Sequence, residues 1–236
     1  MRQRDDMTQG PRSTTPEAMA RTIEGSLASM ADIARRWAPY FARSESRQRA
    51  SASLQGVRSA AERQNSWQVA EACGEPTPYG CQYVLNRADW DADAVRDALC
   101  TDVIQHMGDP HGVLVLDATG CVNKGRHAAR VARQYTGPVG TVEHGHSGVL
   151  VGYASPLGQL LLDRARYWPA AWTQDRERCR QAGIPAARGV ATTPQLARQL
   201  RARALGSGVP AHWVTGDGVY GHDRRLRLWL EARPQA

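Results

Sequence analysis

The sequence predicts an α/β protein in which a small all-helical domain precedes a mixed sheet. Apolar residues recur at helical spacing up to about residue 108, and short apolar strands follow from His111. Two of those strands run directly into an aspartate, in GVLVLDATG and HWVTGDGVYG. We expect residues 1–16 to be a disordered lead, residues 17–108 the helical N-terminal domain, and residues 109–236 the domain that contains the sheet.

Helical spacing is clearest in three places in the N-terminal domain. Leu54 and Val57 lie three residues apart, and SWQVAEAC repeats the spacing around Trp67. The segment DADAVRDALCTDVIQHMG predicts a longer helix, with acidic residues in the first turn where they favour the helix dipole. These segments favour several short helices before the sheet.

The strands predict the order of elements in the second domain. GVLVLD comes first, and HSGVLVGYAS and GQLLLDRARYW then form a hairpin through a turn at residues 155–158. Residues 131–135 predict a further strand edge. A helix follows with Thr192 or Thr193 as its N-cap and Pro194 at its first position, and then the HWVTGD strand and a last helix, DRRLRLWLEA. This order is typical of an incomplete ribonuclease-H-like fold, in which the first and fourth strands lie side by side.

Asp117 and Asp217 are the candidate catalytic residues and metal ligands. If their strands are neighbours, the two carboxylates come within reach of a shared ion. Carboxylates are the ligands that Mg²⁺ prefers, and two such ions clamp the attacking and leaving oxygens in two-metal phosphoryl transfer. The sequence therefore predicts two Mg²⁺ or Mn²⁺ ions acting on phosphate. The alternative is that each aspartate only caps a strand end or begins a turn.

Composition favours a polyanionic partner. The formal net charge is +7, the pI is about 9.5, and Lys124 is the only lysine among 30 basic residues. Part of this arginine bias reflects the base composition of the gene, but guanidinium groups also match phosphate oxygens. Five cysteines without a CxxC pair argue against a zinc site or a disulfide framework. With no long apolar run and no signal peptide, we expect a cytoplasmic protein that does not enter a membrane.

Several sequence blocks resemble one known family, the transposases of the insertion-sequence 701 type with their DDE-superfamily endonuclease domain. The blocks run in order from about Phe41 to Glu231, and they are ERQNSWQVAE, ADWDADAVRD, GVLVLDATG with NKG, RQYTGPVG, GYAS, YWPAAWTQDRERC and GVPAHWVTGDGVYG. The resemblance implies a cut-and-paste DNA transposase with a ribonuclease-H-like core, acting on the terminal inverted repeats of a double-stranded element, and a possible homo-oligomer. Asp117 and Asp217 match the first two acids of the family's triad.

Departures from the family pattern concern the same site. Ala118 stands where the family has Glu, Gly218 follows the second Asp where Glu is frequent, and the third acid, a Glu on a helix well downstream, has no counterpart at the usual distance. After Asp217 the only carboxylates are Asp223 and Glu231, both too close for the usual triad. We therefore expect a truncated transposase, inactive by itself. The alternatives are a non-catalytic DNA-binding remnant and a ribonuclease-H-like metal nuclease.

Three basic residues are candidate DNA contacts. Lys124 and Arg126 follow the first strand and resemble the family's basic pair, and a solvated loop is the alternative. Arg63 is predicted on the same helix as Trp67, where packing of the tryptophan is the favoured interpretation. Glu143, His144 and His146 look like a metal cluster, but we interpret this Gly-rich segment as a polar loop.

Overall fold

A computed structural model describes residues 30–59, 62–123, 128–136, 140–184 and 189–232. The chain divides into two compact units, Met1–Val95 and Arg96–Ala236. The division falls inside helix α5 (Ala92–Met107), whereas the proposed domain boundary at residue 108 follows the end of this helix. The predicted lead at residues 1–16 lies outside the described residues.

Short helices build the first unit. They are η1 (Ala38–Tyr40), α2 (Ser44–Val57), α3 (Ser66–Ala72) and α4 (Tyr79–Asn86). The side chain of Asn65 caps α3 by accepting hydrogen bonds from the backbone N–H groups of Trp67 and Gln68. Val69, Ala70 and Cys81 form a small core. Gly56 lets α2 approach α3 closely, because a β-carbon there would lie 2.7 Å from the backbone oxygen of Val69.

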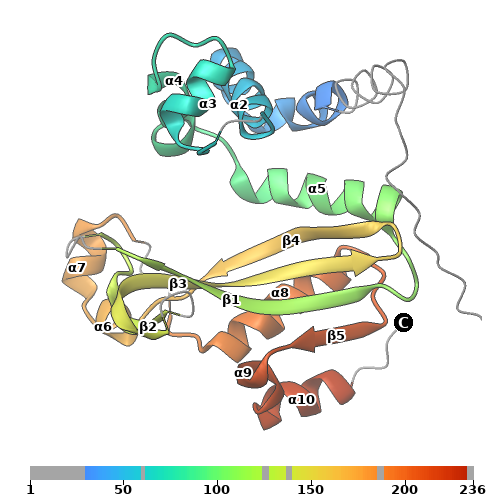
Figure 1. The fold of residues 1–236 in the computed structure, drawn as a ribbon. Helices are drawn as coiled ribbons and strands as arrows, with labels where there is room; N and C mark the ends of the chain where they lie inside the picture. Colours follow the sequence, from blue (N-terminus) through green and yellow to red (C-terminus); the bar gives the residue numbers. More distant parts are fainter. Residues whose placement is uncertain (1–29, 60–61, 124–127, 137–139, 185–188, 233–236) are drawn as a thin grey trace, which may run out of the picture. The chain divides into compact units, whose positions relative to one another are not determined.

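A mixed five-stranded sheet forms the centre of the second unit (Figure 1). Its strands are β1 (Val113–Val122), β2 (Ala132–Thr136), β3 (Thr141–Ser155), β4 (Gly158–Arg166) and β5 (Trp213–Gly216). Antiparallel pairing joins β4 to β3 and β3 to β1, and β5 then pairs parallel to β1. The order β4-β3-β1-β5 is that of the ribonuclease-H-like sheet, and β2 pairs with the first residues of β3. The predicted fold class is confirmed.

Two strands are longer than predicted. β1 continues to Val122, five residues past the expected end at Asp117, and β3 begins at Thr141. The extensions support each other, because Ala118 pairs with Val149 and Val122 pairs with Gly145. Pairing with β2 occupies the other edge of the first residues of β3. The glycines of this segment predicted a loop, but pairing with β2 at residues 141–145 and with β1 from Gly145 onward holds it as a strand.

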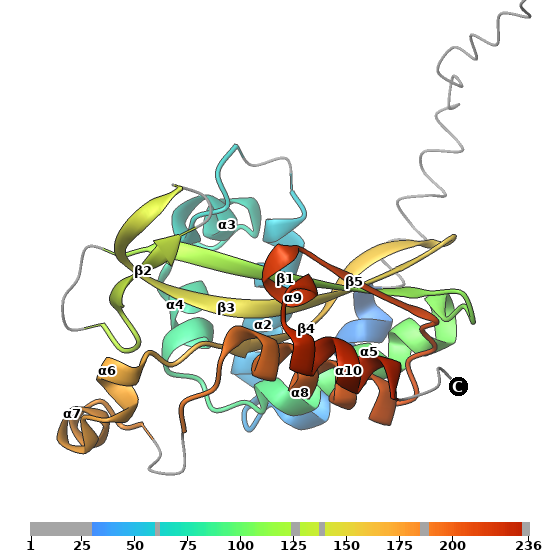
Figure 2. The same ribbon diagram turned by 90° about the horizontal axis from the view of Figure 1, so that it is seen from below.

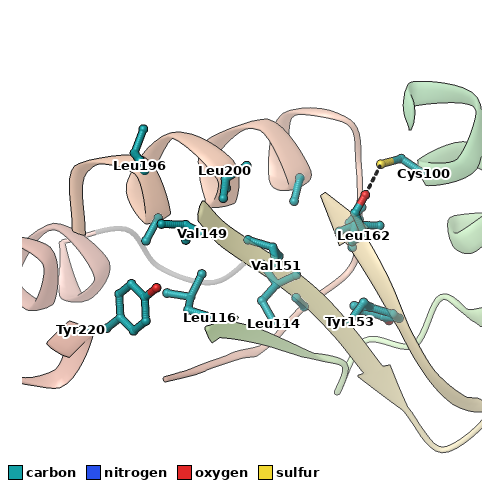
Figure 3. Close-up of a cluster of buried hydrophobic side chains, with 14 of the residues drawn as sticks. Cys100, Leu114, Leu116, Val149, Val151, Tyr153, Leu162, Leu196, Leu200 and Tyr220 are labelled. Atoms are coloured by element: carbon teal, nitrogen blue, oxygen red, sulfur yellow. Dashed lines mark hydrogen bonds between the residues drawn. The ribbon is translucent and has the colours of Figure 1, made fainter. Parts of the chain in front are cut away.

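One face of this sheet carries the helices α8 (Thr193–Gly206), α9 (Gly218–Gly221) and α10 (Arg224–Glu231). Two short helices, α6 (Ala170–Thr173) and α7 (Arg176–Gln181), follow β4 and contact each other. Thr192 caps α8 in a capping box with Gln195, as one of the two predicted N-caps. Apolar residues of α8 meet the sheet in one core, and Figures 2 and 3 show this helix along the strands. The main members of that core are Leu114, Leu116, Val149, Val151, Leu196 and Leu200.

In the described residues of the second unit, no helix covers the other face of the sheet. Side chains alternate along a strand, and Leu114 and Leu116 point into the core, so Val115 and Asp117 point to the opposite side. Residues directly paired across strands share a face. We call this surface the open face, and define it by Val115, Asp117, Leu161, Arg166, Trp213 and Thr215. The exposed fractions of Val115, Leu161 and Trp213 are 37%, 58% and 62%.

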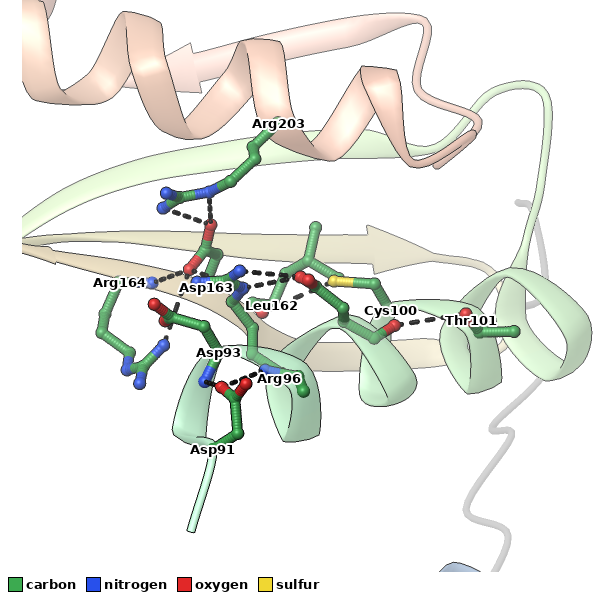
Figure 4. Close-up of polar contacts among 11 residues, drawn as sticks. Asp91, Asp93, Arg96, Cys100, Thr101, Leu162, Asp163, Arg164 and Arg203 are labelled. Atoms are coloured by element: carbon green, nitrogen blue, oxygen red, sulfur yellow. Dashed lines mark hydrogen bonds and ion pairs between the residues drawn. The ribbon is translucent and has the colours of Figure 1, made fainter. Parts of the chain in front are cut away.

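An ion cluster fixes α8 to β4 on the core side. Asp163, which is 4% exposed, accepts from Nε of Arg203 at 2.9 Å, and Nη2 of Arg203 lies 2.8 Å from its Oδ2 (Figure 4). Nε of Arg96 lies 3.6 Å from Oδ1 of the same carboxylate. A bulge in β4 opposite Val151 and Gly152 turns Asp163 to the core side. A buried carboxylate is thereby compensated by guanidinium groups from two helices.

Candidate metal-binding site

Asp117 lies within β1, on the open face. Its Cα is paired with that of Leu150 on β3, so the carboxylate projects from the middle of the sheet and not from a strand end as expected. Oδ1 of Asp117 accepts a hydrogen bond from the backbone N–H of Ala118 at 2.7 Å. The side chain is exposed. A ligand that approaches the open face therefore reaches this carboxylate without displacing any part of the core.

Asp217 directly follows β5. Its Oδ1 accepts from the backbone N–H of Val219 at 2.9 Å and so caps the short helix α9. The capping role that was the alternative explanation for this aspartate is thus present, but it occupies only one of the two carboxylate oxygens. The residue is exposed like Asp117.

The register of the parallel pair brings the two aspartates together. Leu116 is paired with Gly216, and each is followed at once by an aspartate. Both residues continue rows that lie on the open face, after Val115 in β1 and after Thr215 in β5. Parallel neighbours lie about 4.8 Å apart, so the two carboxylates emerge from adjacent backbone positions.

The oxygens of this pair suit a hard divalent cation. In the described residues, each aspartate uses Oδ1 for a backbone hydrogen bond, and Oδ2 makes none. Exposed carboxylate oxygens with room for water are the ligands that Mg²⁺ or Mn²⁺ prefers. Asp117 and Asp217 would hold such an ion from the adjacent strands β1 and β5.

Gly216 allows the close approach that the site requires. A β-carbon there would lie 3.2 Å from the backbone oxygen of Leu116 and 3.0 Å from Cδ2 of Tyr220. Tyr220, one turn after Asp217, is 3% exposed and fills the space beneath the strands (Figure 3). Burial raises its pKa, and the negative charges of Asp217 and Asp117 raise it further. Both aspartates therefore lie close enough to Tyr220 to affect its pKa, in agreement with their placement beside each other.

No third ligand joins the pair among the residues that the structure describes. Within them, no group of three or more His, Cys, Asp or Glu side chains is arranged to hold a metal ion. Asp223 caps α10 by accepting from the backbone N–H of Leu226 at 2.7 Å, and Glu231 ends that helix. The described part of the chain thus supplies two carboxylates to this site.

The interpretation of residues 143–146 as a loop was wrong. Glu143, His144 and His146 lie in β3, where His144 pairs with Arg133 of β2 and His146 pairs with Cys121 of β1. Among the described residues, these side chains do not form a group that could hold a metal ion. Alternating strand geometry separates the neighbours Glu143 and His144 onto opposite faces.

The predicted DNA contacts have different outcomes. Lys124 and Arg126 lie outside the described residues. Arg63 is exposed and lies before α3, which begins at Ser66, so it is not on the same helix as Trp67 as predicted. Asn65 is the N-cap of α3, so the helix begins after it and Arg63 lies outside the helix. The exposed fraction of Trp67 is 64%, so the favoured packing role for this tryptophan was wrong.

All five cysteines are free, in agreement with the absence of a disulfide framework. In the described residues, no helix is both long and apolar enough to cross a membrane.

Comparison with known proteins identifies the family. The model of the DDE superfamily endonucleases matches residues 36–236, which includes both aspartates and the whole sheet. A search of curated proteins found no match. Endonucleases of this superfamily generally depend on divalent metal ions, in agreement with the carboxylate pair. Because the match covers most of its length, the chain belongs to the DDE superfamily of endonucleases.

Proposed function

We propose that the chain is a DNA transposase of the insertion-sequence 701 type, with double-stranded DNA as its substrate and the element's terminal inverted repeats as its specific sites. The observation that carries the proposal is the parallel register of β1 and β5, which sets Asp117 beside Asp217 on an exposed face of the sheet. Resemblance over many sequence blocks supports the assignment to mobile elements.

Asp117 and Asp217 are the proposed catalytic residues and metal ligands. Each carboxylate is oriented through Oδ1 by a backbone N–H, and each offers Oδ2 to the ligand. A divalent cation bound there would stabilise negative charge on the oxygens of a phosphodiester during cleavage and strand transfer. The open face provides exposed surface on which a nucleic acid strand can lie beside these carboxylates.

A site with only two carboxylates holds one metal ion more readily than it holds two metal ions. Two-metal catalysis requires ligands for both ions, and the described residues gather no third acid at the site. We therefore propose that this chain alone binds DNA and a divalent ion but does not cleave efficiently. The resulting activity is that of a DNA-binding transposase chain in which the catalytic centre is incomplete.

Titration calorimetry with Mn²⁺ tests the metal site. Binding heat is expected for the wild-type chain, and Asp117→Asn or Asp217→Asn should remove it. Glu177→Gln on α7 is the matched control. It removes an exposed carboxylate that pairs with Arg180 on the same helix and does not belong to the proposed metal site. Equal heats from wild type and both aspartate variants would exclude this site as the metal centre.

A nicking assay on supercoiled plasmid with Mn²⁺, set beside a gel-shift assay in EDTA, separates cleavage from binding. We expect a shift without nicking. Metal-dependent nicking that Asp217→Ala abolishes would show that the chain has a complete active site. Absence of any shift with duplex DNA would contradict the transposase assignment itself.

A further inference from the structure

Arg166 lies on the open face, at the end of β4. Its Cα is paired with Gly148, which is paired in turn with Thr119 of β1, two residues beyond Asp117. Since strands lie about 4.8 Å apart and residues about 3.3 Å apart along a strand, Arg166 and Asp117 are roughly 12 Å from each other at Cα. The two residues share one exposed surface.

Arg130 is a second cation beside Arg166. It precedes β2, and its guanidinium lies 5.5 Å from the centre of the Trp168 ring, two residues after Arg166. β2 pairs with residues 141–145 of β3 and β4 with residues 148–155 along the same edge, so Arg130, two residues before β2, comes next to Arg166 at the end of β4. In agreement with this placement, burial lowers the pKa of Arg130 and the positive charge of Arg166 lowers it further. Two like charges are held near each other although they repel.

The backbone conformation and hydrogen bonds at residues 130–131 hold Arg130 in this position. Arg130 has φ of 70°, a left-handed conformation that is uncommon for a residue with a side chain. The next residue, Val131, is 4% exposed, and its carbonyl accepts from Nε1 of the buried Trp172 at 2.9 Å. Its own N–H donates to the carbonyl of Ala128 at 3.2 Å. These contacts fix the start of β2, and Trp168 supports the guanidinium.

Acidic partners are absent from this pair in the part of the chain that the structure describes. None of the ion pairs among those residues includes Arg130 or Arg166, whereas the neighbouring Arg164 lies 3.9 Å from Asp163. A pair of guanidinium groups without a carboxylate is a site for an anion, and phosphate oxygens match the guanidinium fork.

We propose that Arg130 and Arg166 together bind one phosphate of the DNA backbone, on the strand whose scissile phosphate lies at Asp117. The pair would then contact flanking DNA, within a few nucleotides of the scissile phosphate. The pair holds the flanking DNA and so sets the position of the strand along the open face. Arg130 and Arg166 are therefore positioning residues. This inference rests on the proposed function, because it takes DNA as the ligand of that face.

The salt dependence of DNA binding tests the pair. Fluorescence anisotropy with a labelled random-sequence duplex, in EDTA, gives the slope of log K against log salt concentration. Each phosphate contact contributes about 0.9 to that slope. We expect Arg130→Gln and Arg166→Gln each to weaken binding several-fold, and the double variant to reduce the slope by about 0.9. Arg166→Lys retains the charge and should retain the slope.

Arg225→Gln is the matched control, since it removes an exposed arginine from α10. It should leave both affinity and slope close to wild type. Thermal unfolding of each variant is the control for an intact fold, and each variant should unfold at a temperature close to that of the wild type. If the double variant keeps the wild-type slope, or if Arg225→Gln loses as much, the phosphate site is wrong while the proposed function stands. If the wild-type chain does not bind the duplex, the proposed function fails.

Discussion

Gly216 lies against the ring of Tyr220 so closely that a β-carbon on the glycine would be 3.0 Å from Cδ2 of the tyrosine. The same β-carbon would be 3.3 Å from Cβ of Leu116 in the neighbouring strand. One residue without a side chain thus allows three things at once: the parallel pairing, the buried aromatic ring and the placement of Asp217 beside Asp117. The geometry of the candidate site depends on this contact.

Gly216→Ala is expected to destabilise the protein by about 1–3 kcal/mol, because the added methyl group would contact the backbone of Leu116 and the buried ring of Tyr220 more tightly than normal van der Waals distance. Urea denaturation followed by tryptophan fluorescence measures the free energy of unfolding. Gly206→Ala at the end of α8 is the control, since a β-carbon there meets no atom within 4 Å and alanine favours a helix. A loss of stability in the control equal to that of Gly216→Ala would contradict the steric explanation.

Tyr220→Phe is expected to raise the free energy of unfolding by about 1 kcal/mol. The hydroxyl of Tyr220 is buried and has no hydrogen-bond partner among the described residues, so the folded state carries its desolvation cost. Phenylalanine keeps the ring and removes this cost. A destabilised Tyr220→Phe variant would reveal a hydrogen bond that the hydroxyl makes in solution.

Alkaline pH should remove stability through the same side chain. In the unfolded chain the phenol ionises near its ordinary pKa of 10.0, whereas burial and the two aspartates raise the pKa in the folded protein. Above pH 10 the unfolded state therefore binds fewer protons than the native state. The free energy of unfolding should fall there by up to about 1.4 kcal/mol per pH unit. Denaturation at a series of pH values should show this share of the slope in wild type and not in Tyr220→Phe.

The strands that lead into the two aspartates were predictable from local patterns, and their adjacency was predictable from the ribonuclease-H-like order of the elements. Apolar runs that end in GVLVLD and HWVTGD predict buried strands, and parallel strands of this topology place equivalent positions side by side. The capping box at Thr192 is likewise a short-range signal.

The length of β1 and β3 was not predictable from the same patterns. Residues 118–122 and 141–147 contain glycines and polar residues that are typical of loops, and only their pairing with each other and with β2 makes them strands. The Arg130–Arg166 pair was missed for a similar reason. The two arginines are far apart in sequence, and their proximity depends on Trp168 and on the start of β2.

Asp163→Asn should cost about 3–5 kcal/mol of stability, because it leaves the guanidinium groups of Arg203 and Arg96 beside a buried neutral amide. Asp97→Asn is the matched control. Asp97 lies 2.8 Å from Nη2 of Arg96, but its side chain is 59% exposed, so its removal should cost less than about 1 kcal/mol. Thermal or urea unfolding of the two variants gives the comparison. Equal losses would show that the buried position of Asp163 adds nothing.

Thiol reactivity should distinguish Cys121 from Cys100. Cys121 is exposed on β1, whereas Cys100 is 4% exposed and its Sγ lies 3.9 Å from the carbonyl oxygen of Leu162. Burial raises the pKa of Cys100, and the nearby charges of Asp163 and Asp97 raise it further, so its thiolate is rare as well as inaccessible. We expect Ellman's reagent to modify Cys121 rapidly in the native protein and Cys100 only after unfolding.

Mass spectrometry of peptides after brief labelling identifies the modified cysteine, and Cys121→Ser should remove the rapid phase.

Cys121 also lies on the same strand as Asp117, four residues further on, and its side chain is on the same face of the sheet as that of Asp117. Saturating duplex DNA should therefore slow the labelling of Cys121 if DNA lies on the open face. Rapid labelling of Cys100 in the native protein would contradict the packing of α5 on β4, and unchanged labelling of Cys121 under saturating DNA would place the nucleic acid elsewhere.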